Sequence, residues 1–391
     1  MAEEVTLITY SEIGLKSKPV RKTLEQQLAR HIRTSLKREG NANVKIVRIQ
    51  GRLIVEGGDT LTVAETASKV FGVTSAIPAV KVTSDMDAIA QTALDMALQS
   101  IKDDQSFAVR ARRVGEQTYT SRDIEVKVGA EILKHLKTRG VKVDLEDPDI
   151  TIYVEARDSD AYIYHRVIDG PNGLPFGSQG KLISLFSGGI DSPVAAWLMM
   201  KRGADVKLLF LDQRPFVGED YCTKALKVTE KLRQYVPLKS YFLNVAPMGD
   251  IMDEIGKHVP PKFTCVVCKR MMYRIACGLA EKMGADGIVT GENLGQVASQ
   301  TLANLRVLDD TSTLPVYRPL IGFEKMEIVA LAKRIGTYEA SISSVHGCSA
   351  VPSKPATKAR IEDVLEAEKK IPMDKLVSEA LEGITRTNIA G

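Results

Sequence analysis

The sequence predicts an α/β protein whose C-terminal half, residues 181–391, forms a doubly wound, mostly parallel sheet, preceded by two α+β segments. The first observation is an apolar run at 182–186, followed by a turn of Gly and Ser and then by helix-forming residues. Beyond it, short apolar runs alternate with helical patterns, as in a parallel sheet with helices on both faces. Residues 1–75 instead follow the order β-α-β-β-α, which is typical of a small α+β unit.

The composition is that of a globular protein with more than one domain. Of 391 residues, 44% are hydrophobic and 26% are charged, and the formal net charge is +4. A net charge of this size is compatible with nucleic-acid binding but does not indicate it; only a clustering of Lys and Arg would. No stretch has the length of a membrane span and no signal peptide begins at Met1, which predicts no membrane partner and a cytoplasmic location. The five cysteines, all after residue 220, do not suit a secreted disulfide framework.

The first segment, residues 1–75, has the order of a ferredoxin-like unit. Its first helix is crowded with basic residues and has few acids, so we take Lys16, Arg21 and Lys22 as candidate nucleic-acid contacts. The alternative is an ordinary solvated helix face. The expected elements are a strand at 5–10, a helix with apolar positions from 24 to 36, strands at 43–49 and 52–55, and a helix at 61–70.

The second segment, residues 76–170, contains the strand Ser106-Phe-Ala-Val-Arg-Ala-Arg-Arg-Val114. This strand, the Asp-Leu…Pro-Asp turn at 144–149 and the position before the C-terminal half resemble the THUMP domain, an RNA-binding module of tRNA-modifying enzymes. The resemblance implies that Arg110, Arg112 and Arg113 hold RNA phosphates. The alternative is a structural α+β domain with solubilising arginines. The expected elements are helices at 86–101 and 123–138, strands at 106–114, 141–154 and 161–168, and a Gly- and Pro-rich linker at 171–180.

The central motif of the C-terminal half is Ser187-Gly-Gly-Ile-Asp-Ser192, which follows the first buried strand. The glycines leave no Cβ between a ligand and the backbone, and the free N–H groups of the following helix make an anion site. No Gly-Lys-Ser/Thr follows, which excludes the Walker loop. The alternative is an ordinary strand-to-helix turn. The motif resembles the PP-loop of ATP pyrophosphatases, which implies ATP phosphates on Ser187, Gly188, Gly189 and Ser192, and Mg²⁺ organised by Asp191.

A second motif, Thr290-Gly-Glu-Asn-Leu-Gly-Gln-Val-Ala-Ser-Gln-Thr301, lies at the corner after a later strand. Its glycines permit close approach of the backbone, and we take Gly291 and Gln300 as nucleotide contacts. The PP-loop resemblance further implies that Phe210, Leu211, Ile183 and Ser184 contact adenosine or line its pocket, the alternative being plain sheet core. The expected elements are strands at 206–211, 240–245 and 286–290, helices at 220–236 and 273–283, and an amphipathic helical tail from 358.

These motifs, together with Lys269-Arg-Met-Met272, Arg318-Pro-Leu-Ile321 and the opening Tyr10-Ser-Glu-Ile-Gly-Leu-Lys16, are similar to the ThiI family of tRNA 4-thiouridine synthetases. The resemblance spans nearly the whole chain in the family's domain order. It implies a homodimeric enzyme that uses ATP to adenylate O4 of uridine 8 in tRNA. Sulfur then attacks C4, so that AMP and pyrophosphate are the products. Lys269 would neutralise phosphate charge or hold the RNA backbone.

Three cysteines, Cys265, Cys268 and Cys348, are the candidate sulfur-handling residues. The family usually has a cysteine at the position of Cys348, whereas the Cys-Val-Val-Cys pair departs from its familiar bacterial pattern; we expect no appended rhodanese domain. The leading interpretation is an iron–sulfur cluster of the 4Fe–4S type with one iron open to sulfide. In this the chain resembles archaeal-type thiouridine synthetases, which use three cysteines in the same way. The alternatives are a persulfide and disulfide relay, or a zinc site completed by His346 or His258. Sulfur would come from sulfide or a cysteine desulfurase.

Two other functions compete with this one. The chain could be another PP-loop tRNA thiolase or adenylating enzyme, although those generally lack the THUMP-like strand at 106–114. It could also be a non-catalytic RNA-binding protein with a vestigial nucleotide pocket, against which the intact Asp191 argues.

Overall fold

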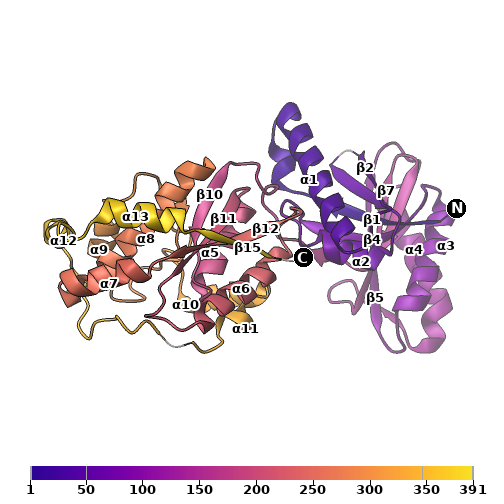
Figure 1. The fold of residues 1–391 in the computed structure, drawn as a ribbon. Helices are drawn as coiled ribbons and strands as arrows, with labels where there is room; N and C mark the ends of the chain where they lie inside the picture. The colour runs from indigo at the N-terminus through magenta and orange to yellow at the C-terminus, as the bar shows by residue number, and fades with distance from the viewer. Residues whose placement is uncertain (1, 50, 346, 390–391) are drawn as a thin grey trace. The chain divides into compact units, whose positions relative to one another are not determined.

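The computed structural model describes residues 2–49, 51–345 and 347–389. It divides the chain into two compact units, Met1–Gly173 and Leu174–Gly391, which are described separately (Figure 1). Within the described residues, no helix combines the length and apolar character that a bilayer crossing needs.

The first part of the N-terminal unit has the β-α-β-β-α order expected from the sequence, and a further strand, β4, follows it. The strands pair in the order β2-β3-β1-β4, and β1 is antiparallel to both of its neighbours. Helix α2 begins at a proper cap, because the side chain of Asp59 accepts from the Thr62 N–H at 2.8 Å. The elements are β1 (Glu3–Thr9), a 3-10 turn (Glu12–Leu15), α1 (Lys18–Arg38), β2 (Lys45–Ile49), β3 (Arg52–Glu56), α2 (Thr60–Ala67) and β4 (Ser75–Thr83).

The second part of this unit extends the same sheet, because β8 pairs with β4. The complete strand order is β2-β3-β1-β4-β8-β7-β5-β6, with β9 paired to β4. Helices α3 and α4 pack together over it, and their buried residues Ile89, Ile124 and Val128 share one core with Phe107 of β5. The elements are α3 (Met86–Ser100), β5 (Ser106–Val114), α4 (Ser121–Leu136), β6 (Lys142–Val143), β7 (Ile150–Arg157), β8 (Asp160–Tyr164) and β9 (Ile168–Asp169).

The C-terminal unit is built on a six-stranded sheet in the order β14-β13-β10-β11-β12-β15. All neighbouring pairs are parallel except β12 and β15, so the predicted doubly wound, mostly parallel sheet is confirmed. Its strands are β10 (Lys181–Leu185), β11 (Asp205–Asp212), β12 (Tyr241–Pro247), β13 (Ile288–Val289), β14 (Val316–Tyr317) and β15 (Thr385–Ile389).

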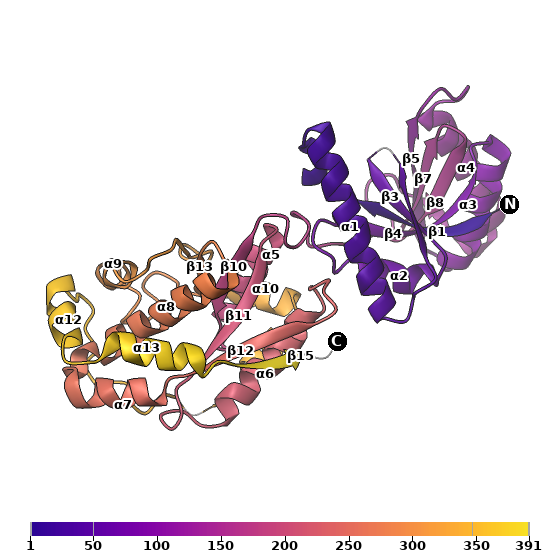
Figure 2. The same ribbon diagram turned by 45° about the horizontal axis from the view of Figure 1, so that its top comes forward.

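Helices cover both faces of this sheet (Figures 1 and 2). Helix α8 packs on β10 and contacts α7, α9 and α13, whereas α5 and α6 pack on the strands with α10 and α11 beside them. The helices are α5 (Asp191–Lys201), α6 (Asp220–Arg233), α7 (Gly249–His258), α8 (Thr264–Met283), α9 (Leu302–Asp309), α10 (Lys325–Arg334), α11 (Tyr338–Ser341), α12 (Ile361–Glu368) and α13 (Met373–Glu382).

Several elements differ from the expectation: the strand expected at 141–154 is divided into β6 and β7, and helix α7 lies where none was expected. Helix α8 begins at Thr264, not near 273, so the Cys-Val-Val-Cys pair lies in its first turns. The tail from 358 contains the expected helices α12 and α13, but the strand β15 follows them and pairs antiparallel with β12. Its β-branched residues alternate after Gly383, and its backbone hydrogen bonds cover the edge of the sheet.

Candidate active site

The loop between β10 and α5 is held by its own serines. The Ser187 N–H donates to Ser192 Oγ at 3.1 Å, and the Gly189 N–H donates to Ser187 Oγ at 3.3 Å. Gly188 has φ +72°, and a Cβ there would lie 2.8 Å from the Cα of Ala225 on α6. Glycine is therefore required at 188 both by the backbone conformation and by the close approach of α6.

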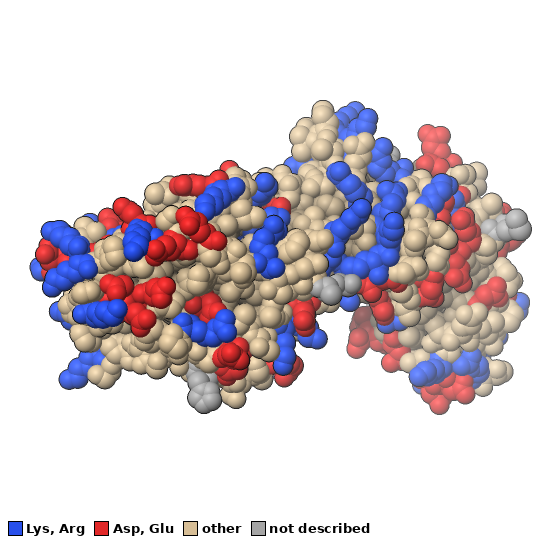
Figure 3. Space-filling model, viewed as in Figure 1, with Lys and Arg blue, Asp and Glu red and all other residues tan. Residues whose placement is uncertain are grey.

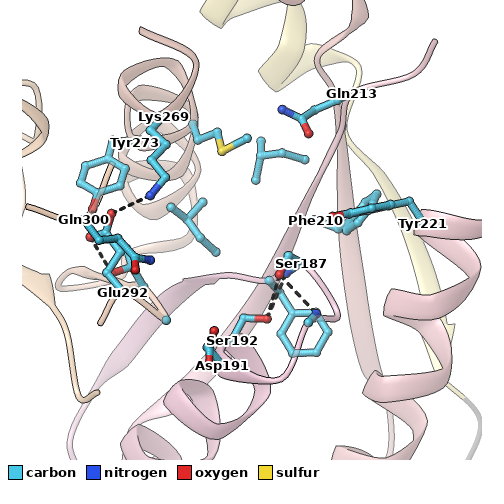
Figure 4. Close-up of a pocket in the computed structure, with 17 residues that line it drawn as sticks. Ser187, Asp191, Ser192, Phe210, Gln213, Tyr221, Lys269, Tyr273, Glu292 and Gln300 are labelled. Carbon is cyan, nitrogen blue, oxygen red and sulfur yellow. Dashed lines mark hydrogen bonds and ion pairs between the residues drawn. The ribbon is translucent and has the colours of Figure 1, made fainter. Parts of the chain in front are cut away.

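A cavity of about 270 Å³ opens above this loop, at the carboxyl ends of the strands (Figure 4). That is where a doubly wound sheet binds its ligands. Ser187, Asp191 and Ser192 lie on one side of it, and Lys269, Glu292 and Gln300 lie on the other. The residues proposed from the sequence that line it are Ser187, Gly189, Asp191, Ser192, Phe210, Leu211, Lys269, Gly291 and Gln300.

Three other proposed nucleotide contacts do not line this cavity. Gly188 forms the loop beneath it, and Ile183 and Ser184 lie on β10, each with a fully buried side chain. The structure thus places these residues behind the cavity wall, where they support the loop.

The corner after β13 packs directly on the start of α5. A Cβ on Gly291 would lie 2.9 Å from the backbone nitrogen of Ser192 and 3.0 Å from the carbonyl carbon of Asp191. The absence of a side chain at 291 therefore lets the second motif close against the first and complete the cavity.

The carboxylate of Asp191 has two partners that come from distant parts of the chain. Lys325 Nζ, at the start of α10, lies 2.6 Å from Asp191 Oδ1, and Gln296 Nε2 donates to Oδ2 at 3.0 Å. Lys325 was not proposed from the sequence, and no local pattern marks it. It adds a positive charge beside the loop that would receive phosphates.

A buried carboxylate, Glu292, organises the opposite wall. It accepts hydrogen bonds from Tyr273 Oη at 2.7 Å, Arg318 Nε at 2.8 Å and Thr290 Oγ1 at 3.1 Å, and Lys269 Nζ lies 3.3 Å away. Burial opposes its ionisation, but the charge of Lys269 and the hydrogen bonds from Tyr273 and Arg318 outweigh burial and lower the pKa of Glu292. Glu292 therefore stays ionised and orients Lys269 toward the cavity.

The three candidate cysteines line a second cavity, of about 210 Å³. Cys265 and Cys268 are three residues apart in the first turns of α8, so they share one face, and Cys348 comes from the segment after α11. Both cavities are lined by Gln213, Lys269 and Met272. The nucleotide cavity and the cysteine cavity therefore meet at a common wall.

Two of the three thiols, those of Cys265 and Cys268, are harder to ionise than a free cysteine. Burial raises the pKa of Cys268 to about 12, and burial together with the charge of Cys348 raises the pKa of Cys265. Within 2–49, 51–345 and 347–389, no three His, Cys, Asp or Glu side chains lie close enough to hold a metal ion. His258 pairs with Glu254 on α7 at 3.4 Å, and His346 lies outside the described residues.

Arg270, the neighbour of Lys269 on α8, faces away from both cavities. Its side chain is only 1% exposed, and its Nε donates to Glu368 Oε1 at 2.7 Å. The phosphate or RNA role expected of Lys269 therefore does not extend to its neighbour Arg270.

The basic residues proposed as RNA contacts all lie in the N-terminal unit. Lys22, Arg110, Arg112 and Arg113 are exposed, and Figure 3 shows Lys and Arg gathered over α1 and the neighbouring strands. Arg21 is partly used locally, because its Nη2 donates to Gly14 O at 2.5 Å and Lys16 O at 3.2 Å. Arg110 and Arg113 also donate to backbone carbonyls, those of Leu145 and of Gly115 and Gln117.

Comparison with known proteins agrees with this arrangement. Residues 177–373 match the family model described as thiamine biosynthesis protein (ThiI), 83–166 match the THUMP domain, and 5–76 match the ThiI ferredoxin-like domain. A probable tRNA sulfurtransferase of Methanothermobacter thermautotrophicus is 38% identical over 392 residues, covering 99% of this chain and 98% of the relative. The chain belongs to the ThiI family.

Other proteins and solved structures are similar over most or nearly all of the chain. A probable tRNA sulfurtransferase of Methanobrevibacter smithii is 39% identical over 98% of this chain and all of the relative. A crystal structure of a 4-thiouridine synthetase–RNA complex with bound ATP has a TM-score of 0.88 and 33% identity, covering 99% of this chain and 100% of that one. A structure from Pyrococcus horikoshii has a TM-score of 0.65 and 28% identity, covering 85% and 99%.

Proposed function

We propose that this member of the ThiI family is a tRNA 4-thiouridine synthase, which uses ATP to activate uridine 8 of tRNA and replaces its O4 with sulfur. The observation that carries the proposal is the wall of Gln213, Lys269 and Met272 shared by the two cavities. A base at that wall would touch an activated phosphate on one side and a sulfur carrier on the other. The similar 4-thiouridine synthetase structure holds both ATP and RNA, which supports the same assignment.

In the first step, uridine O4 attacks the α-phosphorus of ATP. The O4–P bond forms, the bond to the bridging oxygen of the β-phosphate breaks, pyrophosphate leaves with the electron pair, and the N3 proton of the base is lost. The N–H groups of Ser187 and Gly189 and the hydroxyl of Ser192 would hold phosphate oxygens at the start of α5. Lys269 and Lys325 would neutralise the charge that develops.

Mg²⁺ fits the chemistry of this site, because a magnesium ion takes one or two carboxylates together with substrate phosphates. Asp191 lines the cavity and would be its protein ligand, once Lys325 turned from the carboxylate to the phosphates. The metal would supply charge neutralisation at the departing pyrophosphate. Ile183, Ser184 and Gly188 would support the loop, and Phe210, Leu211, Gly291 and Gln300 would contact the nucleotide.

In the second step, a sulfur nucleophile attacks C4, the C4–S bond forms and AMP leaves with the former O4. We propose that Cys265, Cys268 and Cys348 handle this sulfur. Their chemistry fits an iron–sulfur cluster of the 4Fe–4S type, since three thiols and no carboxylate line the cavity, although their spacing in the described residues is wider than a metal site. When bound, such a cluster would present sulfide at its open iron. The raised pKa values of Cys265 and Cys268 weigh against a persulfide relay that begins on either of these two thiols without assistance.

We further propose that the N-terminal unit positions the tRNA, through Lys16, Arg21 and Lys22 of its first part and Arg110, Arg112 and Arg113 of its second. Contacts to phosphates orient an RNA without reading its sequence. The division is proposed as a ferredoxin-like domain at 1–75, a THUMP domain at 76–170, a linker at 171–180 and a catalytic domain at 181–391. A homodimer, a cytoplasmic location and sulfide or a cysteine desulfurase as sulfur donor complete the proposal.

Two measurements on the purified protein and an unmodified tRNA transcript test the function. The protein should release pyrophosphate only when tRNA is present, and with a sulfur donor it should convert uridine 8 to 4-thiouridine, seen by nucleoside mass spectrometry. Asp191→Asn should abolish both. Sulfur at another position would identify a different tRNA thiolase, and tRNA binding without pyrophosphate release would identify a non-catalytic RNA-binding protein.

The sulfur site is tested by anaerobic purification with iron, sulfide and zinc analysis. A cluster predicts iron and sulfide together with visible absorption, all lost in Cys268→Ala. Zinc alone would support the structural metal site. A metal-free protein that transfers sulfur from a persulfide on Cys348 would support the relay.

A further inference from the structure

One side chain of the turn at the end of β11, residues 212–216, lines both cavities. Gln213 lines the nucleotide cavity and the cysteine cavity. Its Nε2 lies 3.2 Å from Cys268 Sγ and 3.9 Å from the sulfur of Met252. A thioether sulfur can only accept hydrogen bonds, so two sulfur atoms on one side fix the amide with its NH₂ group toward them.

The backbone of this turn is held firmly. Phe216 N–H donates to Gln213 O at 2.9 Å, and Met248 N–H donates to Asp212 O at 2.7 Å. The side chain of Asp212, which is 8% exposed, receives the guanidinium of Arg214 at 2.8 and 3.0 Å. Both neighbours of Gln213 are therefore anchored, so its side chain starts from a fixed point.

The same turn also holds the segment that carries the third cysteine. The carbonyl oxygen of Phe216 accepts from Ser349 N–H at 2.9 Å and from Ser349 Oγ at 3.2 Å. Ser349 directly follows Cys348. One turn thus fixes Cys268 through a side chain and the Cys348 segment through a backbone carbonyl.

We infer that Gln213 is a positioning residue for the sulfur-transfer step, holding the sulfur of Cys268 at the wall between the cavities with its amide N–H. The inference rests on the proposed function and deepens it. An N–H aimed at sulfur stabilises negative charge there, and it does so more strongly in a buried cavity than in water. In Figure 4 Gln213 lies on the side of the nucleotide cavity opposite Glu292, and the same residue lines the cysteine cavity. Its contact with Cys268 concerns the sulfur-transfer step.

The two steps can be measured separately. Pyrophosphate release by cluster-free protein, with ATP, Mg²⁺ and tRNA but without a sulfur donor, reports adenylation, and 4-thiouridine formation after the cluster and the sulfur donor are supplied reports transfer. Gln213→Met keeps the length of the side chain and removes the donor, whereas Gln213→Glu keeps the shape and turns an acceptor toward sulfur. Gln91→Glu, on the exposed side of α3, makes the same chemical change in the N-terminal unit, outside the unit that holds the two cavities, and is the control.

Because Gln213 also lines the nucleotide cavity, the quantity compared with wild type is the rate of 4-thiouridine formation divided by the rate of pyrophosphate release. We expect this ratio to fall by about 10- to 100-fold in Gln213→Met, and further in Gln213→Glu because two lone-pair acceptors would meet. Equal loss in both steps, or a Glu variant as active as wild type, would overturn the inference. Wild-type protein that releases no pyrophosphate with tRNA would instead defeat the proposed function, so the two failures are distinguishable.

Discussion

Replacing Glu368 with Gln should strongly destabilise the C-terminal unit. Glu368 lies at the end of α12, and its carboxylate binds both Arg270 and Arg274 of α8. Burial opposes its ionisation, but hydrogen bonds from the two arginines outweigh burial and lower the pKa of Glu368. The substitution keeps the shape and removes the charge on which α8 is anchored.

The size of the effect follows from the burial of Arg270. Its side chain is 1% exposed, and the Glu368 side chain is 6% exposed. Removing one member of such a pair leaves a buried charge uncompensated and costs about 3–5 kcal/mol. Asp310 remains 3.0 Å from Arg270 and, although it is 34% exposed, it offsets part of the loss. We therefore expect a value near the lower end, about 3 kcal/mol.

Urea unfolding followed by tryptophan fluorescence measures this free energy. The single tryptophan, Trp197, lies buried on α5 and so reports on the C-terminal unit. The midpoint should fall with an unchanged slope against urea. Glu366→Gln is the control, because Glu366 pairs with Lys369 on the exposed face of the same helix and its loss should shift nothing measurable. A Glu368→Gln midpoint no lower than that of the control would refute the reasoning.

Three other predictions follow from separate sites. Lys325→Ala removes the cation beside Asp191 and should slow tRNA-dependent pyrophosphate release at least about tenfold, with the unfolding midpoint unchanged as the check on folding. Gly188→Ala should abolish ATP binding in calorimetry, because its Cβ would meet the Ala225 backbone at 2.8 Å, and binding at wild-type affinity would contradict that contact. Burial lowers the pKa of His31 from 6.5 to about 4, so between pH 7 and 5 the imidazole takes up a proton in the unfolded chain but not in the folded one. The N-terminal unit should therefore lose about 2 kcal/mol between pH 7 and 5, and in His31→Leu, followed by circular dichroism, this part of the loss should vanish.

The parts of the fold that depend on local pattern were predictable from the sequence. The apolar run at 182–186 became β10, and the alternation beyond it became the parallel sheet. The strand β15 was missed, since its partner β12 lies far away in the chain and five residues of mixed character carry little local signal. The early start of α8 was missed for a related reason, as cysteine and valine are weak helix formers that tertiary packing overrode.

The residues of the site show the same contrast between what local sequence predicts and what depends on distant contacts. The residues of the two motifs were found because each motif is a continuous stretch, with glycines where the backbone must approach closely. Lys325 and Gln213 were missed, because what makes them important is the distance to Asp191 and to Cys268, and neither distance is encoded nearby. Glu292 was interpreted only as part of its motif, although its four partners come from helix α8, from the end of β13 and from the segment after β14.

Three consecutive residues of α8 show how one helix divides the chemistry. Successive residues of a helix point about 100° apart, so three consecutive side chains face three different directions. Cys268 faces the cysteine cavity, Lys269 lies on the wall between the two cavities, and Arg270 is buried against Glu368. The anchor at Arg270 thus sets the rotation of the helix, and with it the positions of the thiol and the ammonium. Weakening that anchor should therefore disturb adenylation and sulfur transfer together, whereas a change at Gln213 should disturb sulfur transfer more than adenylation.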